Sequence, residues 1–332
     1  MVGVPGHVCV SGDGDFVGPI LGGGLCSLVD HTYDALRRLT RGLRRAASGN
    51  KLHAGFASLS VWIAEATTGG KAQDLLYSKV ATTATTAANA FVARNVGTLP
   101  SARGTGGTSG TGVVCNSATT GALKFVNPTG GDTTHLTTWT GQATAISSLM
   151  LFDCLWDMTY NHASSTSTAV DAVNVPTRYT SAALAPGNFL SSEITTQLIG
   201  TAHTITVTYK DQDDNTAEAA SAYSAAASAV VGRCNTPAGT WFVPLNADDT
   251  GLVRVTNIAQ STTVTGVSTF FIGHPLALAP FPLANVPFVF DGINSAFSLV
   301  RIYDDACLSF MTPGIATTGS ITYNGLIRIV SG

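Results

Sequence analysis

Residues 204–209, Thr-Ile-Thr-Val-Thr-Tyr, alternate polar and apolar side chains with the period of two that a half-buried β-strand requires. The next six residues, 210–215, form a polar turn cluster, so the strand ends there and the chain reverses. Similar blocks follow at residues 252–258, 264–272 and 321–329. The C-terminal half is therefore expected to be antiparallel sheet with one solvated face.

Further strand candidates flank this half of the chain. They are the run through Phe56, Leu59, Val61 and Ile63, and residues 122–126, 143–156 (with room for a short helical turn), 169–175, 189–199 and 301–310. Residues 217–229 fit either a helix or a tightly packed strand. Four prolines between 275 and 287 predict an extended crossing segment and not a central strand. The expected fold is mainly β, an antiparallel β-sandwich or jelly-roll-like domain with an N-terminal extended arm and a short basic helix.

The chain divides into three parts by composition. Residues 1–50 are an extended Gly-rich arm followed by a basic amphipathic helix, residues 51–112 are a mixed segment, and residues 113–332 form the sandwich-like part. The mixed segment ends in a Gly/Ser/Thr-rich stretch, residues 96–112, which is long enough to be a flap that reaches beyond its own domain. This stretch is the best candidate for an internal boundary.

The N-terminal part carries an unusual concentration of positive charge. Asp30 is placed as an N-cap, and an apolar face follows at helical spacing. The rest of the wheel holds five arginines: Arg37, Arg38, Arg41, Arg44 and Arg45. This basic face is either solvated or in contact with a partner chain or nucleic acid. Only seven basic residues lie beyond position 110, so nucleic-acid contact is expected through this helix alone.

Composition sets the general class of protein. Charged residues make up 11% of the 332 residues, well below the roughly 25% of an average soluble domain, which predicts a neutral surface extensively covered by neighbours. No apolar run is long enough for a transmembrane helix, and residues 1–24 are too rich in Gly and Asp for a secretory signal, so a cytoplasmic protein with no membrane contact is expected.

The six cysteines lie far apart and include no Cys-x-x-Cys pair, so their spacing supports neither a zinc knuckle nor a redox motif. Buried free thiols are expected. Oxidation after release from a cell remains an alternative, because it could join neighbouring chains.

Motifs that carry chemistry are missing. The chain has no Gly-x-Ser-x-Gly, His-Glu-x-x-His or phosphate-binding loop. Asp211, Asp213 and Asp214 lack the spacing of a calcium loop, and the adjacent pairs at 248–249 and 304–305 point to opposite faces of an extended chain. The four tryptophans are interpreted as core or interface anchors, with a sugar-binding platform as the alternative. No catalytic, cofactor or metal residue is nominated, and no enzyme or small-molecule substrate is expected.

Four segments in order resemble a group of tailed-bacteriophage virion structural proteins, encoded among head genes. They are Leu-Lys-Phe-Val-Asn-Pro (123–128) with Leu-Met-Leu-Phe-Asp-Cys-Leu-Trp (149–156), residues 204–215, Phe-Val-Pro-Leu-Asn-Ala-Asp-Asp-Thr-Gly-Leu (242–252) and residues 301–310. The resemblance covers roughly residues 124–310. The sequence departs from the pattern at Cys154, where a basic residue is common, and in the more acidic turn at 211–215.

The resemblance implies a capsid decoration or cement protein on an icosahedral head, assembled in the bacterial host cytoplasm. Its partners would be the major capsid protein and copies of itself, as a trimer or dimer. Residues 1–24 and 96–112 are the expected intersubunit contacts, because both are too poor in apolar residues to fold alone. The alternatives are another virion component (major capsid, tail tube or baseplate) and a receptor- or carbohydrate-binding virion module. A glycan-cleaving hydrolase would need two carboxylates in a groove.

Overall fold

The computed structural model describes residues 9–10, 16–17 and 58–332, except 68, 85–88, 95–98, 105, 182, 226–229, 238, 293–298 and 316–318. The chain forms two compact units, Met1–Lys51 and Leu52–Gly332. In the first unit, β1 (Cys9–Val10) pairs antiparallel with β2 (Phe16–Val17). The predicted basic helix and its five arginines lie outside the described residues.

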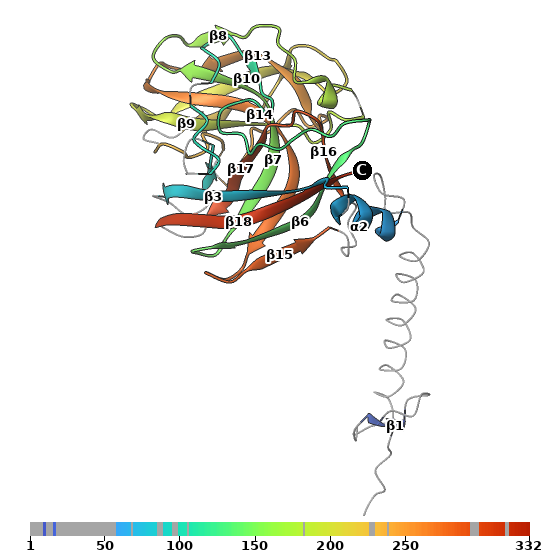
Figure 1. Ribbon diagram of the computed structural model, residues 1–332. Helices are drawn as coiled ribbons and strands as arrows, with labels where there is room; N and C mark the ends of the chain where they lie inside the picture. The colour runs from blue at the N-terminus through green and yellow to red at the C-terminus, as the bar shows by residue number, and fades with distance from the viewer. Residues whose placement is uncertain are drawn as a thin grey trace, which may run out of the picture. The chain divides into compact units, whose positions relative to one another are not determined.

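The described part of the second unit holds three antiparallel sheets (Figure 1). The central sheet contains β4 (Asn89–Val92), β17 (Leu308–Ile315), β7 (Ser147–Asn161), β14 (Thr265–Phe281) and β9 (Phe189–Ile199), with β5 (Val113–Val114) also on β7. The β6 sheet contains β15 (Phe288–Asp291), β6 (Thr134–Ala143), β18 (Gly319–Ser331) and β3 (Ala72–Ala84), with β16 (Val300–Ile302) also on β6. The β10 sheet contains β11 (Glu218–Ala219), β10 (His203–Asp211), β13 (Leu252–Gln260) and β8 (Ser167–Ala169), with β12 (Tyr223–Ala225) also on β10. The mainly β, antiparallel prediction is confirmed.

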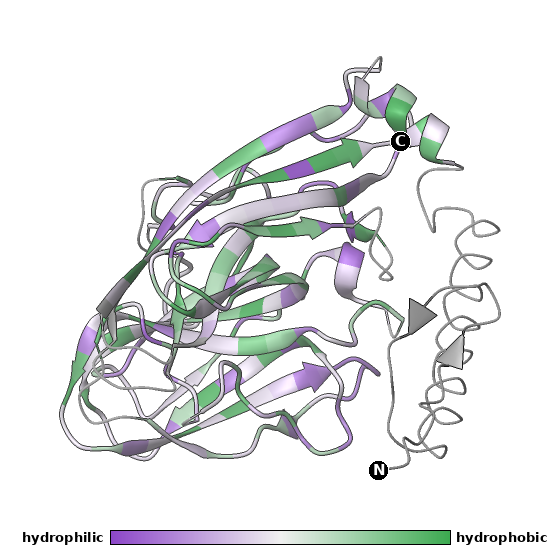
Figure 2. Cartoon of the chain, turned by 90° about the horizontal axis from the view of Figure 1, so that it is seen from below, coloured by the Kyte–Doolittle hydropathy of each residue, from purple (hydrophilic) through white to green (hydrophobic). Residues whose placement is uncertain are grey.

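Both smaller sheets cover one face of the central sheet, at different ends of β7. Leu149 and Leu151 belong to the core shared with the β6 sheet, whereas Trp156 and Met158 belong to the core shared with the β10 sheet. Figure 2 shows hydrophobic and polar segments following one another along several of the strands. Burial of these apolar side chains, at roughly 25 cal/mol per Å², is the main stabilising contribution.

Strand β10 contains the sequence on which the fold prediction rests. Ile205, Val207 and Tyr209 are buried, and the threonines between them are partly exposed, as the alternation predicts. The predicted turn follows, because the Asp211 carboxylate accepts hydrogen bonds from the backbone nitrogens of Asp213 (2.9 Å) and Asn215 (2.8 Å). The three similar blocks form β13, β14 and β18, and residues 189–199 form β9, so these strand predictions are confirmed.

Strand β14 contradicts the prediction for the proline-rich segment, because it continues through Pro275 and Pro280 to Phe281. β9 pairs with β14 only as far as Gly273, so beyond that residue one edge of β14 has no strand partner among the described residues. A bulge at Leu276 places the two prolines opposite Phe152 and Ser148 of β7, in the same phase of the ladder. A proline nitrogen has no hydrogen to donate to a neighbouring strand. It is tolerated at these positions because β9 no longer pairs with this edge of β14.

The run predicted as a strand near residue 60 is a helix, α2 (Leu59–Thr67). The Ser58 side chain accepts a hydrogen bond from the Val61 nitrogen and caps the first turn. Trp62 and Ala66 pack against a small cluster around Leu299 and Val330. The packing of these two side chains therefore determines the structure of this run. Leu59, Val61 and Ile63, whose alternation predicts a strand, are exposed. Phe56 lies outside the described residues.

Several other strand predictions need correction. Residues 122–126 form no strand: the Leu123 nitrogen donates to the Leu308 oxygen, but the backbone of the exposed Val126 bonds to the Gln73 side chain and not to a neighbouring strand. Residues 143–156 contain no helical turn, because β6 ends at Ala143 and β7 begins at Ser147 after bends. Only β8 overlaps residues 169–175. Residues 301–310 divide into β16 and β17 around a turn in which Asp305 has a φ of 59°. Residues 217–229 contribute β11 and β12, which settles the open alternative in favour of strand for the described part.

The glycine-rich stretch at 96–112 packs on its own unit. The Gly107 oxygen accepts a 2.6 Å hydrogen bond from the Thr159 nitrogen, and the Arg103 nitrogen donates to the Arg94 oxygen at 2.7 Å. In its described residues this stretch is therefore not a free flap, because the backbone of β7 provides partners for it. From Leu52 on, the mixed segment belongs to the same compact unit as residues 113–332, and it contributes β3 and β4 to sheets completed by later strands.

Candidate functional site

Strand β7 carries two buried carboxylates, Asp153 and Asp157. The pairing with β14 passes from Ile272–Trp156 to Gly273–Cys154, so Leu155 is an extra residue and forms a β-bulge. The bulge shifts the alternation by one residue. Asp153 therefore lies on the face covered by the two smaller sheets, whereas Cys154 and Asp157 share the opposite face.

Asp157 is held by two guanidinium groups. Arg94 binds its Oδ2 atom, and Arg103 binds both oxygens, with Nε–Oδ2 2.9 Å and Nη2–Oδ1 3.1 Å. The Arg94 guanidinium also lies over the Phe271 ring, 4.8 Å from its centroid. Burial favours the protonated acid, but the two arginines outweigh it and hold the pKa of Asp157 below its ordinary value.

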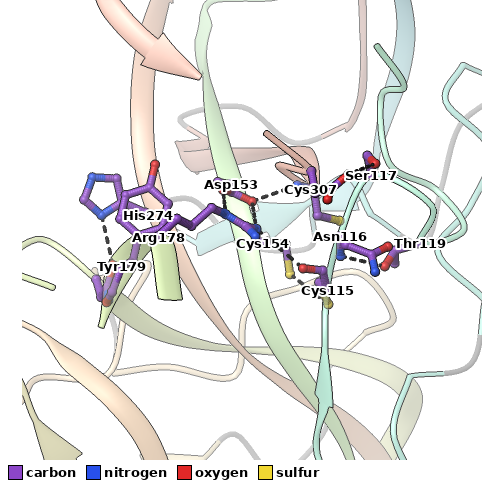
Figure 3. Close-up of polar contacts among 12 residues, drawn as sticks. Cys115, Asn116, Ser117, Thr119, Asp153, Cys154, Arg178, Tyr179, His274 and Cys307 are labelled. Atoms are coloured by element: carbon purple, nitrogen blue, oxygen red, sulfur yellow. Dashed lines mark hydrogen bonds and ion pairs between the residues drawn. The ribbon is translucent and has the colours of Figure 1, made fainter. Parts of the chain in front are cut away.

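Three cysteines gather beside this ion pair: Cys115 after β5, Cys154 on β7 and Cys307 before β17 (Figure 3). All three are buried free thiols, and the Sγ atoms of Cys115 and Cys154 are 3.8 Å apart. Burial raises the pKa of Cys154, but the neighbouring thiols and the Arg94 charge outweigh burial and lower it. Contact with Cys154 raises the pKa of Cys115. The site can therefore stabilise one thiolate sulfur.

On the other face of β7, Asp153 lies between the core shared with the β6 sheet and the core shared with the β10 sheet. Arg178, from the short 3-10 helix η1 (Thr177–Tyr179), binds both of its oxygens at 2.7 and 2.9 Å, and the Cys307 nitrogen donates to it at 2.8 Å. Burial raises the pKa of Asp153 to about 6 in spite of the arginine. Next to this pair, His274 stacks on Tyr179 with ring centroids 4.1 Å apart. The arrangement is a saturated ion pair with an aromatic cover (Figure 3).

The structure also places the residues that the sequence singled out. Cys115, Cys154, Cys234 and Cys307 are buried free thiols, as predicted for them. Asp211 fixes its own turn, Asp249 accepts a hydrogen bond from Tyr209, and Asp305 accepts one from Asn127.

The tryptophans pack as anchors. Trp139 and Trp156 are fully buried, and Trp62 and Trp241 are partly buried against hydrophobic clusters. Trp139 and Trp156 have no exposed face for a sugar-binding platform, whereas Trp62 and Trp241 are partly exposed, and for these two the alternative stays a prediction.

A groove of about 570 Å³ lies between β3 and residues 120–124, with Leu76, Leu99 and Leu123 on its walls. Its charged lining residues are Asp74 and Lys124, and Asp74 is paired with Arg328 at 2.7 Å. This lining provides no pair of carboxylates. Among the described residues, no helix is long and apolar enough to cross a membrane.

No family model matches the chain, and no curated protein matches it. Among solved structures, the infectious bursal disease virus VP2 subviral particle is matched at 10% identity and a TM-score of 0.18, over 78% of this chain and 80% of that chain. The Gx strain of the same virus is matched at 10% identity and a TM-score of 0.18, over 79% and 81%. A mutant VP2 protein of that virus, in derived T=1 particles, is matched at 10% and 0.16, over 79% and 78%. At such TM-scores these matches carry no argument about this chain.

Proposed function

We propose that this chain is a structural protein of a bacteriophage virion and not an enzyme, and that it decorates and cements an icosahedral head. It would bind the major capsid protein and copies of itself as a trimer or dimer on the capsid surface, after assembly in the bacterial host cytoplasm. The sequence resemblance over residues 124–310 provides the family-level support. No small molecule, cofactor or membrane is part of this proposal.

The observation that carries the proposal is an exposed apolar edge on the β6 sheet. We call it the β15 rim and define it by Ile146, Leu283, Val286 and Val289, which are all exposed. A hydrogen bond from the Asn285 nitrogen to the Ala143 oxygen (2.7 Å) and the pairing of Val289 with Thr140 tie its segments together.

β15 is short and pairs with β6 on one side only among the described strands. Apolar side chains beside an open strand edge favour contact with another protein surface. Many such modest contacts, repeated over a symmetric shell, add up to tight attachment.

The interior supports a structural role as well. Asp153 and Asp157 lie on opposite faces of one strand, and guanidinium groups bind both. A carboxylate pair acting on a glycan would have to share a groove. Contact with packaged nucleic acid, where the virion has any, is assigned to Arg37, Arg38, Arg41, Arg44 and Arg45, and this assignment stays a prediction.

Cryo-electron microscopy of the purified virion tests the proposal. We expect hundreds of copies on the outside of the icosahedral lattice, with the β15 rim facing a shell subunit or a neighbouring copy. Copies that form the shell itself would replace decoration with a major capsid role. A few copies at the tail or one vertex would replace it with a tail or adsorption role. Absence of the chain from the virion would refute every virion role named here.

A further inference from the structure

The three thiols and the carboxylate on the outer face of β7 suggest a use beyond packing. We propose that Cys115, Cys154, Cys307 and Asp157 bind a zinc ion that ties three distant segments of the chain together. This inference does not depend on the function proposed above.

The first argument is geometric. The ligand atoms of Cys115, Cys154 and Asp157 all lie within 4.8 Å of one another, and the two sulfurs are 3.8 Å apart. Two sulfurs bound to one tetrahedral zinc ion, each about 2.3 Å from the metal, are themselves about 3.8 Å apart. Cys307 lies beside these two thiols (Figure 3) but is not among the residues whose ligand atoms all lie within 4.8 Å of one another, so in this proposal its thiol moves toward the ion to become the fourth ligand.

The second argument is charge. Three thiolates and the Asp157 carboxylate bring four negative charges into a buried site, and Arg94 and Arg103 bring two positive charges. A divalent cation makes this set neutral, whereas a monovalent ion leaves a buried negative charge, which is costly in a low-dielectric interior. Each thiol that is neutral before binding releases its proton to water, and no oxidant or reductant is needed.

The third argument concerns which divalent ion fits. Sulfur ligands favour zinc over magnesium and calcium, which prefer oxygen. Cys115, Cys154 and Cys307 are at most 1% exposed and lie in a hydrophobic cluster, so the site is closed, as structural zinc sites are. Arg94 and Arg103 hydrogen-bond to the oxygens of the Asp157 carboxylate and orient it, which is the usual role of groups that hydrogen-bond to a metal ligand.

Metal analysis of the full-length chain, purified under reducing conditions without a chelator, tests the site. We expect one zinc ion per chain by inductively coupled plasma mass spectrometry. After refolding with cobalt instead, we expect sulfur-to-cobalt charge-transfer bands and the visible bands of a tetrahedral ion. Refolding with a chelator present should lower the melting temperature relative to refolding with zinc.

Variants locate the metal. Cys154→Ser and Asp157→Asn should lose or weaken zinc binding, while Cys234→Ser should keep it, because Cys234 is a buried thiol of the same hydrophobic cluster that bonds to Ser191 instead. If Cys154→Ser does not fold, the cobalt spectrum of the unaltered chain still decides. A chain with no bound metal and no zinc uptake on refolding overturns the proposal. So does a disulfide between two of the three proposed cysteine ligands, found by peptide mass mapping of the chain purified without metal.

Discussion

Asp153 and Asp157 project from opposite faces of β7, although side chains four residues apart on a regular strand share a face. The extra residue Leu155 reverses the phase between them, and each carboxylate then meets its own arginines, Arg178 on one side and Arg94 with Arg103 on the other. Because of the bulge, β7 binds the preceding segment through Asp157 on one face and the following helix η1 through Asp153 on the other. It also brings Cys154 onto the face of Asp157.

The Asp153–Arg178 pair is expected to matter for stability because it is buried. Asp153→Asn leaves the Arg178 charge without its partner, which costs about 3–5 kcal/mol in the free energy of unfolding. Urea unfolding monitored by circular dichroism measures the loss. Asp74→Asn is the matched control: the Asp74–Arg328 pair is about half exposed, and breaking it should cost at most about 1 kcal/mol. Equal losses in both variants would contradict the prediction.

His162 predicts a loss of stability in acid. Its Nδ1 lies 2.9 Å from Gln260 Oε1 and its Nε2 lies 2.9 Å from Ser268 Oγ, and burial lowers its pKa to about 4. The unfolded chain binds this proton below about pH 6.5 and the folded chain does not, so stability falls as the pH drops from 6.5 towards 4.

Between pH 7 and 5 this histidine should cost about 2 kcal/mol, and His274, whose pKa is also about 4, should cost a similar amount. His162→Gln should therefore lose less stability than the unaltered chain over this interval. Unfolding curves at both pH values provide the measurement. Identical pH dependence in the two proteins would show that His162 does not titrate as described.

Gly112 is expected to tolerate no side chain. A Cβ atom at this position would lie 2.0 Å from the Trp156 Nε1 atom, and the indole is fully buried in the core beneath the β10 sheet. Gly112→Ala must displace the ring or the start of β5, so we expect a loss of about 1–3 kcal/mol. Thr108→Ala, an exposed position in the same stretch, should change the free energy of unfolding by less than about 0.5 kcal/mol. A stable Gly112→Ala variant would mean that this stretch packs differently.

Strands that are buried on one face could be predicted from the sequence, because their alternation has a direct physical cause. β10, β13 and β18 are of this kind. The sequence predicts too short a strand for β14, because prolines usually exclude a central strand. The prolines are acceptable here because β9 ends at their level, and this pairing cannot be read from the sequence. The spacing of Leu59, Val61 and Ile63 indicates a strand and not the helix α2, because these three side chains are exposed and their spacing reports no buried face.

The thiol site could not be predicted by spacing. Cys115 and Cys154 are 39 residues apart, and Cys307 immediately precedes β17 of the central sheet, so only the topology joins them. One signal was present in the sequence: Asp153 and Asp157 interrupt an apolar strand, and buried charges need partners. The number of residues between the two acids suggests a shared face, and the bulge that separates them has no sequence signature. The predicted arginine face lies outside the described residues and stays a prediction.

The β15 rim gives the most direct test of the proposed attachment surface. Val289→Asp together with Leu283→Asp places two charges on the rim without touching the core, because both side chains are more than half exposed. Burying these carboxylates against a shell subunit would be costly, so we expect occupancy on virions to fall at least tenfold, while the melting temperature of the isolated protein stays nearly unchanged. Ile199→Asp is the matched control, since Ile199 is equally exposed and lies at the far end of β9. Quantitative gel analysis of purified virions gives the occupancy. Full occupancy by the double variant would show that the chain attaches through a different surface.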